Sequence, residues 1–129
     1  MISILIPTYN NFNYLKLCLK SLVKNSNFEH EILFHINDGS DGTLDFIRQS
    51  GYKYTYSENN IGLCSAINKV AKLVTKKYIL YSHDDMYFCP EWDTVLVKEI
   101  KLYKNSEFYL SGTMIEPNSG HIVHNFGLT

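Results

Sequence analysis

The sequence predicts an α/β fold, a mostly parallel sheet with helices on both of its faces. Three observations support this prediction. Strand-like and helix-like patterns alternate along most of the chain, the connecting segments are short, and polar residues gather just after the strand patterns. The chain has 129 residues, of which 45% are hydrophobic and 19% charged, enough apolar material for the core of one domain.

The first two elements are a buried strand and an amphipathic helix. Residues 3–6 form a short apolar run that Pro7 is expected to end, as prolines often do in sheets. Asn11 is a residue type that caps helices, so we expect a helix from about Phe12. Its apolar residues recur with helical spacing and would share one face: Phe12, Leu15, Leu19, Leu22 and Val23.

The next segment predicts a second strand at 31–36, a short helix from about Thr43 to Ser50 that Gly51 ends, and a third strand at 53–57. A further helix follows from the clearest apolar stripe in the chain. The residues of this stripe are Leu63, Ala66, Ile67, Val70, Ala71 and Val74.

The last part of the chain predicts a fourth strand at 78–82, a helix that begins at Pro90, and a fifth strand at 107–115. Residues 116–129 have no strong pattern. The inner face of the last helix would be formed by its apolar and aromatic side chains, Trp92, Val95, Leu96 and Tyr103.

Polar residues follow four of the predicted strands directly. In parallel α/β sheets, ligands bind beyond the carboxyl ends of the strands, near the point where the strand order reverses. We therefore expect these four segments, remote in sequence, to meet at one edge of the sheet. They are Thr8-Tyr9-Asn10, residues 37–40, Asn59-Asn60 and Asp84-Asp85.

Asp84 and Asp85 are the main candidates for a metal site. Adjacent carboxylates repel each other, so a cation or hydrogen-bond donors must offset their charge. Mg²⁺ and Mn²⁺ prefer oxygen ligands and commonly take one or two carboxylates together with substrate phosphates. On the dipeptide alone, an exposed turn followed by a helix cap is the favoured interpretation; the position after the fourth strand reverses this preference and favours the metal.

Asp38 is a candidate for contact with a nucleobase, because a carboxylate at a strand end can accept a hydrogen bond from a base N–H. The alternative is ordinary turn chemistry, since residues 38–42 form a strong turn sequence. Gly39 and Gly42 permit close approach of the backbone to a ligand. The segment matches neither the dinucleotide fingerprint nor the phosphate loop of ATPases.

Weaker candidates border these two sites. Tyr9 can stack beside a base, or it can be a partly buried aromatic residue. Asn60, Gly62 and Asn68 have the spacing N-x-G-x-x-x-A-x-N, which is also compatible with a loop, a helix cap and an exposed amide. Three histidines can ligate a metal or contact phosphate, although such residues are more often structural or exposed: His83, His121 and His124.

Composition narrows the class of partner. The net charge is −1, and no basic field indicates a nucleic acid or an anionic membrane as the main partner.

The three cysteines show neither zinc nor disulfide spacing, and we expect Cys18 and Cys64 to be buried. No signal peptide or membrane-spanning segment is recognisable, so a cytoplasmic protein is expected, with peripheral attachment to a membrane through further segments left open.

Taken in order, these motifs resemble the family-2 glycosyltransferases over roughly residues 2–115. The resemblance implies the GT-A fold, a Rossmann-like domain, and transfer of a sugar with inversion from a nucleotide diphosphate donor, UDP- or dTDP-linked. The quoted motifs are Ile4-Leu5-Ile6-Pro7-Thr8-Tyr9-Asn10, Asn37-Asp38-Gly39-Ser40-x-Asp-Gly-Thr43, Asn60-x-Gly62-x-x-x-Ala66-x-Asn68, and Asp84-Asp85.

The resemblance also implies roles for particular residues. The segment Pro7-Thr8-Tyr9 and Asp38 would hold the base, and the segment from Asn60 through Gly62 to Asn68 would border the nucleotide and its diphosphate. Asp84 would lie near the ribose and the metal, and Asp85 would ligate Mn²⁺ or Mg²⁺. Ser82 stands where many members carry a further aspartate.

The resemblance suggests one nucleotide-sugar-binding domain over residues 1–129, incomplete at its C-terminus. Family members usually place their general base well downstream of the metal motif; Glu116 is the one carboxylate after the predicted fifth strand, and no residue is assigned as catalytic. The acceptor, a glycan or a lipid, and a homo-oligomeric state stay open.

Two other classes of function stay open. One is a nucleotide-binding module without catalysis that needs another segment or partner. The other is a nucleotidyltransferase, which predicts a basic, glycine-rich loop after the first strand. Residues 8–11 do not supply such a loop.

Overall fold

The computed structural model describes residues 1–105 and 107–112. It divides into two compact units, Met1–Leu96 and Val97–Thr129. None of the helices in the described ranges is long and apolar enough to cross a bilayer. In chain order the elements are β1 (Ile2–Tyr9), α1 (Phe12–Asn25), β2 (Glu31–Asn37), α2 (Thr43–Ser50), β3 (Lys53–Ser57), α3 (Leu63–Val70), the 3₁₀ turn η1 (Ala71–Leu73), β4 (Tyr78–Tyr81) and α4 (Trp92–Ile100).

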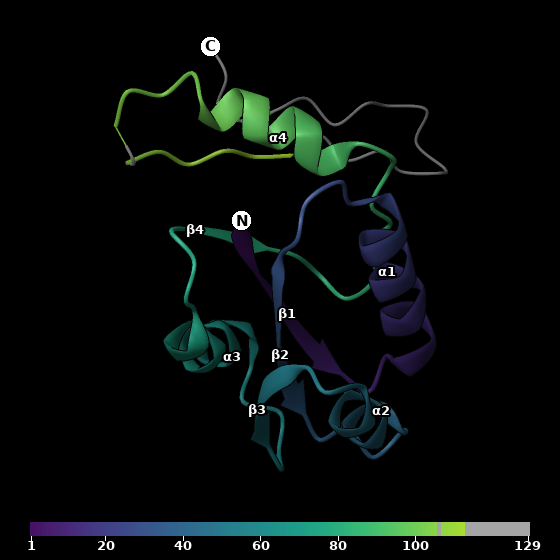
Figure 1. Cartoon of the computed structure of the whole chain (residues 1–129). Helices are drawn as coiled ribbons and strands as arrows, with labels where there is room; N and C mark the ends of the chain where they lie inside the picture. Colours follow the sequence, from purple (N-terminus) through teal and green to yellow (C-terminus); the bar gives the residue numbers. More distant parts are fainter. Residues whose placement is uncertain (106, 113–129) are drawn as a thin grey trace, which may run out of the picture. The chain divides into compact units, whose positions relative to one another are not determined.

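The first unit is built on a four-stranded sheet in the order β3-β2-β1-β4. All of its strand pairs are parallel, as the alternating pattern predicts. Helices α1 and α2 lie on one face of the sheet and α3 on the other (Figure 1). The predicted α/β class with helices on both faces is confirmed, and β1 is the strand from which the chain continues to both sides of the sheet.

Strand β1 continues through Pro7, and the expectation that this residue ends the strand is wrong. The N–H of Ser82 donates to the carbonyl oxygen of Leu5 at 3.0 Å, so Leu5 directs its backbone polar groups toward β4. Pro7, two residues further, faces the same side. Pairing with β4 ends at Leu5 and Tyr81, so the N–H that proline lacks would have had no strand partner there.

Alternation along the strands divides the core between the two faces. Leu5 and Leu33 pack with Val70 of α3, and the partly buried Ile67, Ala71, Leu73 and Val74 surround them. From α1 the buried side chains include three predicted from the apolar stripe, Leu15, Leu19 and Leu22, together with Cys18 and Ser21. Val23 is an exception to the stripe, since 56% of its surface is exposed.

Further expectations fail at helix ends, on two helix surfaces and at the predicted fifth strand. Asn11 stands at the N-cap of α1 but makes no capping hydrogen bond with its side chain, and α4 begins at Trp92 rather than at Pro90, after the left-handed Glu91 (φ 63°). Cys64 and Val95 are exposed, because each lies on the outer side of its helix. The described residues 107–112 form no strand, and the rest of the predicted fifth strand lies outside the described residues.

Gly39 has a structural role in the turn between β2 and α2. It adopts φ 77°, and a Cβ atom there would lie 2.6 Å from Cγ2 of Ile36 and 2.9 Å from Cβ of Leu44. The left-handed conformation and the lack of space both require glycine. Similarly, a Cβ on Gly42 would meet the ring of Phe12 at 3.3 Å, so both glycines allow α1, β2 and α2 to approach one another.

Glu31 joins the strands at the amino edge of the sheet. Its carboxylate accepts hydrogen bonds from the hydroxyls of Ser3 at 2.5 Å and Thr75 at 2.9 Å, and from the N–H of Thr75 at 3.0 Å. Burial alone would raise its pKa, but these donors lower the pKa to about 2. The carboxylate therefore fixes the segment before β4 against β1 and β2, away from the edge that carries the predicted site.

Candidate functional site

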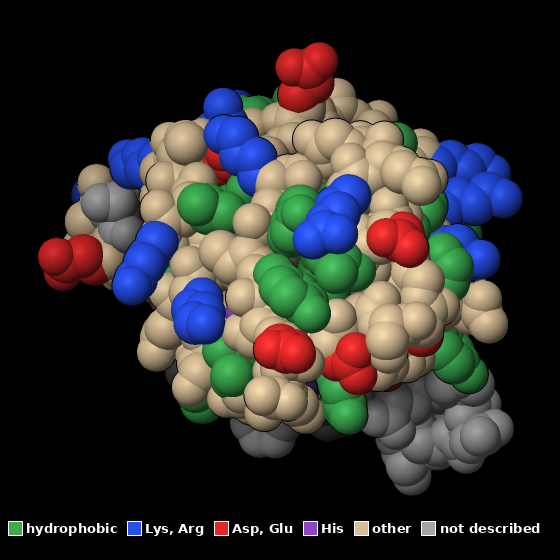
Figure 2. Space-filling model, turned by 90° about the horizontal axis from the view of Figure 1, so that it is seen from below, with side chains coloured by type: hydrophobic (Ala, Val, Ile, Leu, Met, Phe, Trp, Pro, Cys, Tyr) green, Lys and Arg blue, Asp and Glu red, His purple; other side chains and the backbone are tan. Residues whose placement is uncertain are grey.

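The predicted polar segments meet at the carboxyl edge of the sheet, around the end of β1. Strand order reverses here, because β2 and β4 pair with opposite sides of β1. Figure 2 shows the molecule from below, a view in which hydrophobic side chains gather near the centre with acidic and basic side chains beside them. A hollow of about 330 Å³ lies there, lined by Pro7, Thr8, Tyr9, Asn11, Asn37, Asn60, Gly62, Leu63, His83 and Asp84.

Asp84 is held by two donors that come from the end of β1 and the start of α1. The hydroxyl of Thr8 donates to its Oδ2 at 2.7 Å, and the Nδ2 of Asn11 donates to its Oδ1 at 3.0 Å. Thr8 is buried, so its hydroxyl depends on this acceptor. The two bonds connect segments 76 and 73 residues apart and hold the carboxylate at the wall of the hollow.

Asp85 differs from its neighbour because it is exposed and has no hydrogen-bond partner among the described residues. Its carboxylate oxygens are therefore available to a cation. No group of three or more His, Cys, Asp or Glu side chains in the described part of the chain can hold a metal ion by itself. A Mg²⁺ or Mn²⁺ ion at Asp84 and Asp85 would therefore have one or two carboxylate ligands from the described residues. Phosphate and water oxygens would complete its coordination.

The backbone of His83, next to this acidic pair, is held by two hydrogen bonds. The carbonyl oxygen of His83 accepts hydrogen bonds from the hydroxyl of Ser82 at 2.9 Å and from the Sγ of Cys18 at 3.7 Å. Burial, with a smaller effect of the Asp84 and Asp85 charges, raises the pKa of Cys18 to about 11. The thiol is therefore a proton donor at neutral pH, and Cys18 is buried as predicted.

Asp38 lies near the site but does not line the hollow. It has the left-handed φ of 61°, and its carboxylate accepts hydrogen bonds from Asn10 Nδ2 at 2.9 Å and from the N–H of Ser40 at 3.1 Å. These two donors lower the pKa of Asp38. Its conformation is thus that of the turn, and its hydrogen bonds favour the ionised carboxylate.

Asn37, which the sequence did not single out, lines the hollow where Asp38 does not. Its Oδ1 accepts the N–H of Ile61 at 3.0 Å and faces the ring of His35 at 3.3 Å. The amide nitrogen has no hydrogen-bond partner among the described residues. Asn11 was also missed as a lining residue. Asn37 is the first residue of the second motif and Asn11 directly follows the first motif, and these positions were the available signal.

The loop before α3 contributes Asn60 and Gly62. The Oδ1 of Asn60 accepts the N–H of Gly62 at 2.9 Å, and Gly62 adopts φ 78°. Both residues line the hollow, whereas Asn68 is exposed on α3 outside it. The predicted residues His121, His124 and Glu116 lie outside the described residues.

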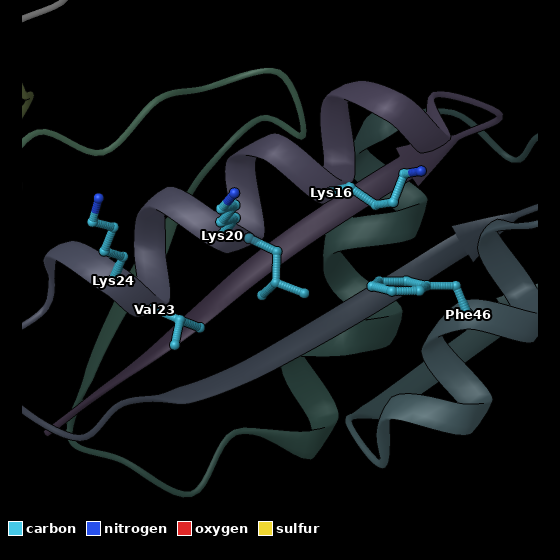
Figure 3. A pocket seen from close by; sticks show the side chains of 6 residues that line it. Lys16, Lys20, Val23, Lys24 and Phe46 are labelled. Carbon is cyan, nitrogen blue, oxygen red and sulfur yellow. The ribbon is translucent and has the colours of Figure 1, made fainter.

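A second hollow, of about 370 Å³, lies along the outer side of α1. Its floor is apolar and includes Phe46 of α2, while three lysines one turn apart border it (Figure 3). Its lining shares no residue with the strand ends, so it has none of the polar groups of the first hollow. The lining residues are Lys16, Leu19, Lys20, Val23, Lys24 and Phe46.

Comparison with protein families identifies the class. The model of Glycosyl transferase family 2 matches residues 3–125, and the chain belongs to this family. The sequence-based assignment, which rested on the strand-end motifs, is confirmed.

Curated relatives come from Rickettsia. A protein of Rickettsia prowazekii named as an uncharacterized glycosyltransferase is 38% identical over 92 residues, which are 68% of this chain and 28% of that protein. A Rickettsia bellii protein of the same description is 31% identical over 130 residues, 96% of this chain and 19% of that protein. The chain thus spans less than a third of the length of these relatives.

Solved structures confirm the fold. S. aureus TarS 1–349 superposes with a TM-score of 0.70 at 24% identity, covering 78% of this chain and 32% of that one; a complex with UDP-GlcNAc gives the same score and identity. The mannosyltransferase PcManGT from Pyrobaculum calidifontis, in complex with GDP-Man and Mn²⁺, gives a TM-score of 0.62 at 20% identity and covers 77% of this chain and 32% of that one. The sheet is therefore of the GT-A type.

Proposed function

We propose that this chain forms the nucleotide-sugar-binding part of a glycosyltransferase that transfers a sugar from a nucleotide diphosphate donor, with a divalent cation and with inversion. The observation that carries the proposal is the hydrogen-bonded junction of Thr8, Asn11 and Asp84. It brings the end of β1 and the segment after β4 to the wall of one hollow, at the edge where α/β sheets bind ligands.

The donor would lie along this hollow with its base toward β1 and its diphosphate toward Asp84 and Asp85. Tyr9 is exposed at the rim and offers a face for stacking, and the amide of Asn37 offers a donor for a base carbonyl. TarS and PcManGT structures hold UDP-GlcNAc, UDP and GDP-Man, which supports a nucleotide-sugar donor for this chain. We propose a UDP- or dTDP-linked sugar.

The residues fit a divalent cation, Mn²⁺ or Mg²⁺, held by Asp85 and Asp84. Such a cation offsets the charge that develops on the leaving diphosphate. Asp84 is oriented by Thr8 and Asn11, while exposed Asp85 has no competing donor among the described residues. The chain's own part is thus to bind the nucleotide and to orient the carboxylates; inversion also needs a general base, for which we assign no residue.

Calorimetric titration with UDP, dTDP, GDP and ATP, each in Mn²⁺ and in chelator, tests the proposal. We expect binding of UDP or dTDP that is stronger in Mn²⁺. Preferential binding of ATP would instead support a nucleotidyltransferase, and no binding of any nucleotide would contradict the proposal.

Asp38→Ala is expected to weaken binding of the base more than binding of bare diphosphate. The pKa of the carboxylate is lowered, so it is ionised, and it accepts a hydrogen bond from Asn10, which adjoins the lining residues Tyr9 and Asn11. We expect a loss of roughly 10-fold for uridine, about the value of one hydrogen bond to a charged group, and little change for pyrophosphate. Equal losses for the two ligands would make Asp38 a purely structural turn residue.

A further inference from the structure

The hollow lacks a strong cationic group of its own. Among the described residues that line it, none is lysine or arginine, and Asp84 adds a negative charge to its wall. A nucleoside diphosphate brings further negative charge to the same place. Among the lining side chains, His83 alone carries an imidazole, whose N–H can face a phosphate oxygen whether or not the ring is protonated.

The backbone of His83 is positioned for such a contact. Its carbonyl oxygen is held by Ser82 and Cys18 on the side of the core, at 2.9 and 3.7 Å. Ser82 is buried, whereas the His83 side chain is exposed toward the hollow. The residue therefore has a fixed main chain and a side chain that lies next to Asp84.

The ring of His83 has a partner from β4. The hydroxyl of Tyr81 lies 3.3 Å from ring nitrogens of His83, and the two ring centroids are 5.1 Å apart. Burial, followed by the charges of Asp84 and Asp85, raises the pKa of Tyr81, so its hydroxyl keeps its proton. When this hydroxyl donates to one ring nitrogen, the other nitrogen carries the N–H, which can donate to a ligand.

We propose that His83 contacts the diphosphate of the donor nucleotide through its ring N–H, with Tyr81 orienting the imidazole. The inference rests on the proposed nucleotide site and adds a residue that distinguishes a nucleoside diphosphate from a nucleoside. In this arrangement His83 binds phosphate directly, while Asp84 and Asp85 act through the cation.

The test uses His83→Ala and His83→Gln, with Asn13→Ala on the exposed side of α1 as the control. Dissociation constants for UDP, GDP, uridine and guanosine are measured by calorimetry in chelator and again in Mn²⁺. Since His83 is exposed, we expect each variant to fold, which circular dichroism verifies.

In chelator we expect His83→Ala to weaken UDP or GDP binding about 10-fold, in line with the loss of one hydrogen bond to a charged group, and to leave the nucleosides unchanged. His83→Gln keeps an N–H donor and is expected to lose only about 3-fold. Tyr81→Phe keeps the aromatic ring and is expected to lose less than His83→Ala.

Three results would overturn the inference. A loss that occurs only in Mn²⁺ would make His83 a metal ligand, and an equal loss for nucleosides would make it structural. Unchanged UDP and GDP binding in His83→Ala would exclude the contact. In each of these cases the wild type still binds nucleotide; failure of the wild type to bind any nucleotide would instead contradict the proposed function itself.

Discussion

Asp85→Asn is expected to remove the metal-dependent part of nucleotide binding. The substitution keeps the size of the side chain but removes the charge that holds the cation, and Asp85 is exposed, so the fold should not change. In Mn²⁺ the affinity for UDP should fall by at least roughly 10–100-fold, the range seen when even the outer partners of metal ligands are removed. In chelator, wild type and variant should bind alike.

The matched control is Asp45→Asn, which removes an exposed carboxylate from the first turn of α2. It should leave UDP affinity in Mn²⁺ unchanged. If Asp85→Asn bound UDP in Mn²⁺ as tightly as the wild type, the assignment of Asp85 to the cation would be wrong.

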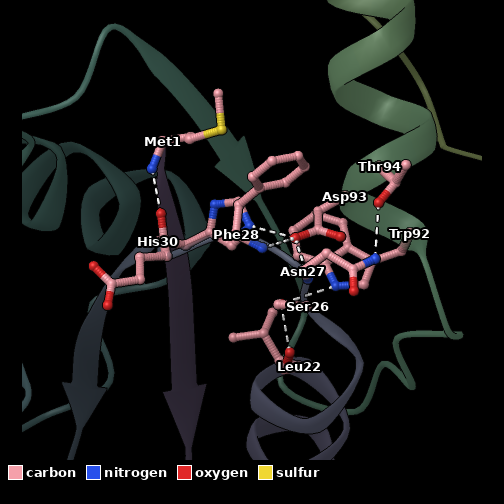
Figure 4. A network of polar contacts seen from close by, with 10 residues as sticks. Met1, Leu22, Ser26, Asn27, Phe28, His30, Trp92, Asp93 and Thr94 are labelled. Carbon is pink, nitrogen blue, oxygen red and sulfur yellow. Dashed lines mark hydrogen bonds and ion pairs between the residues drawn. The ribbon is translucent and has the colours of Figure 1, made fainter.

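Asp93→Ala is expected to be the most destabilising of these changes. Asp93 is fully buried in the first turn of α4, and its Oδ2 accepts hydrogen bonds from the N–H groups of Asn27 and Phe28 and contacts Nε2 of His30 at 3.0 Å (Figure 4). Alanine would leave these buried donors without an acceptor. We expect a loss of about 3 kcal/mol in the free energy of unfolding, measured by urea denaturation.

The pH dependence gives a second readout for the same residue. Burial opposes ionisation of Asp93, but the hydrogen bonds from His30, Phe28 and Asn27 outweigh it and lower the pKa below 3.8. Because the folded-state pKa is depressed, the carboxylate contributes its stability above pH 3.8 and loses it as the pH falls through the folded value. The Asp93→Ala variant should lack this part of the acid sensitivity.

Asp93→Asn separates the charge from the geometry. The Oδ1 of Asp93 has no hydrogen-bond partner among the described residues, so an amide nitrogen can replace it while the other oxygen keeps its three contacts. We expect a loss of roughly 1–2 kcal/mol, smaller than for alanine. The exposed Asp45→Ala should cost less than either, and a comparable cost there would mean that Asp93 acts only through the helix dipole.

The fold was predictable from the sequence because local signals agree with the global arrangement. The bounds of α2 and β3 match their predictions, since turn residues end each element where the apolar pattern ends. The expectation for Pro7 was wrong because a proline disrupts a strand only where a neighbouring strand would need its N–H. Whether such a strand lies beside it depends on the whole sheet. Val23 and Val95 were expected to face the core but are exposed, because an apolar residue at the margin of a helical stripe can face solvent.

The site was predictable as a set of segments but not as a set of contacts. Strand-end polarity predicted the convergence of Thr8, Asn60 and Asp84 on one hollow. It could not predict that the side chain of Asn11 donates to Asp84 instead of capping α1, because that depends on a partner 73 residues away. Nor could it show that Asn37 rather than Asp38 lines the hollow, since the left-handed φ of Asp38 turns its carboxylate to Asn10.

The most direct test of the account is a map of nucleotide contacts on the 14.9 kDa chain by amide chemical-shift changes during titration with UDP and Mg²⁺. We predict the largest changes at Thr8, Asn11, Gly62 and the residues 83–85, with little change along the lysine-bordered hollow of α1. Changes centred on Lys16, Lys20 and Lys24, with none at the carboxyl edge of the sheet, would contradict the assignment of the nucleotide site.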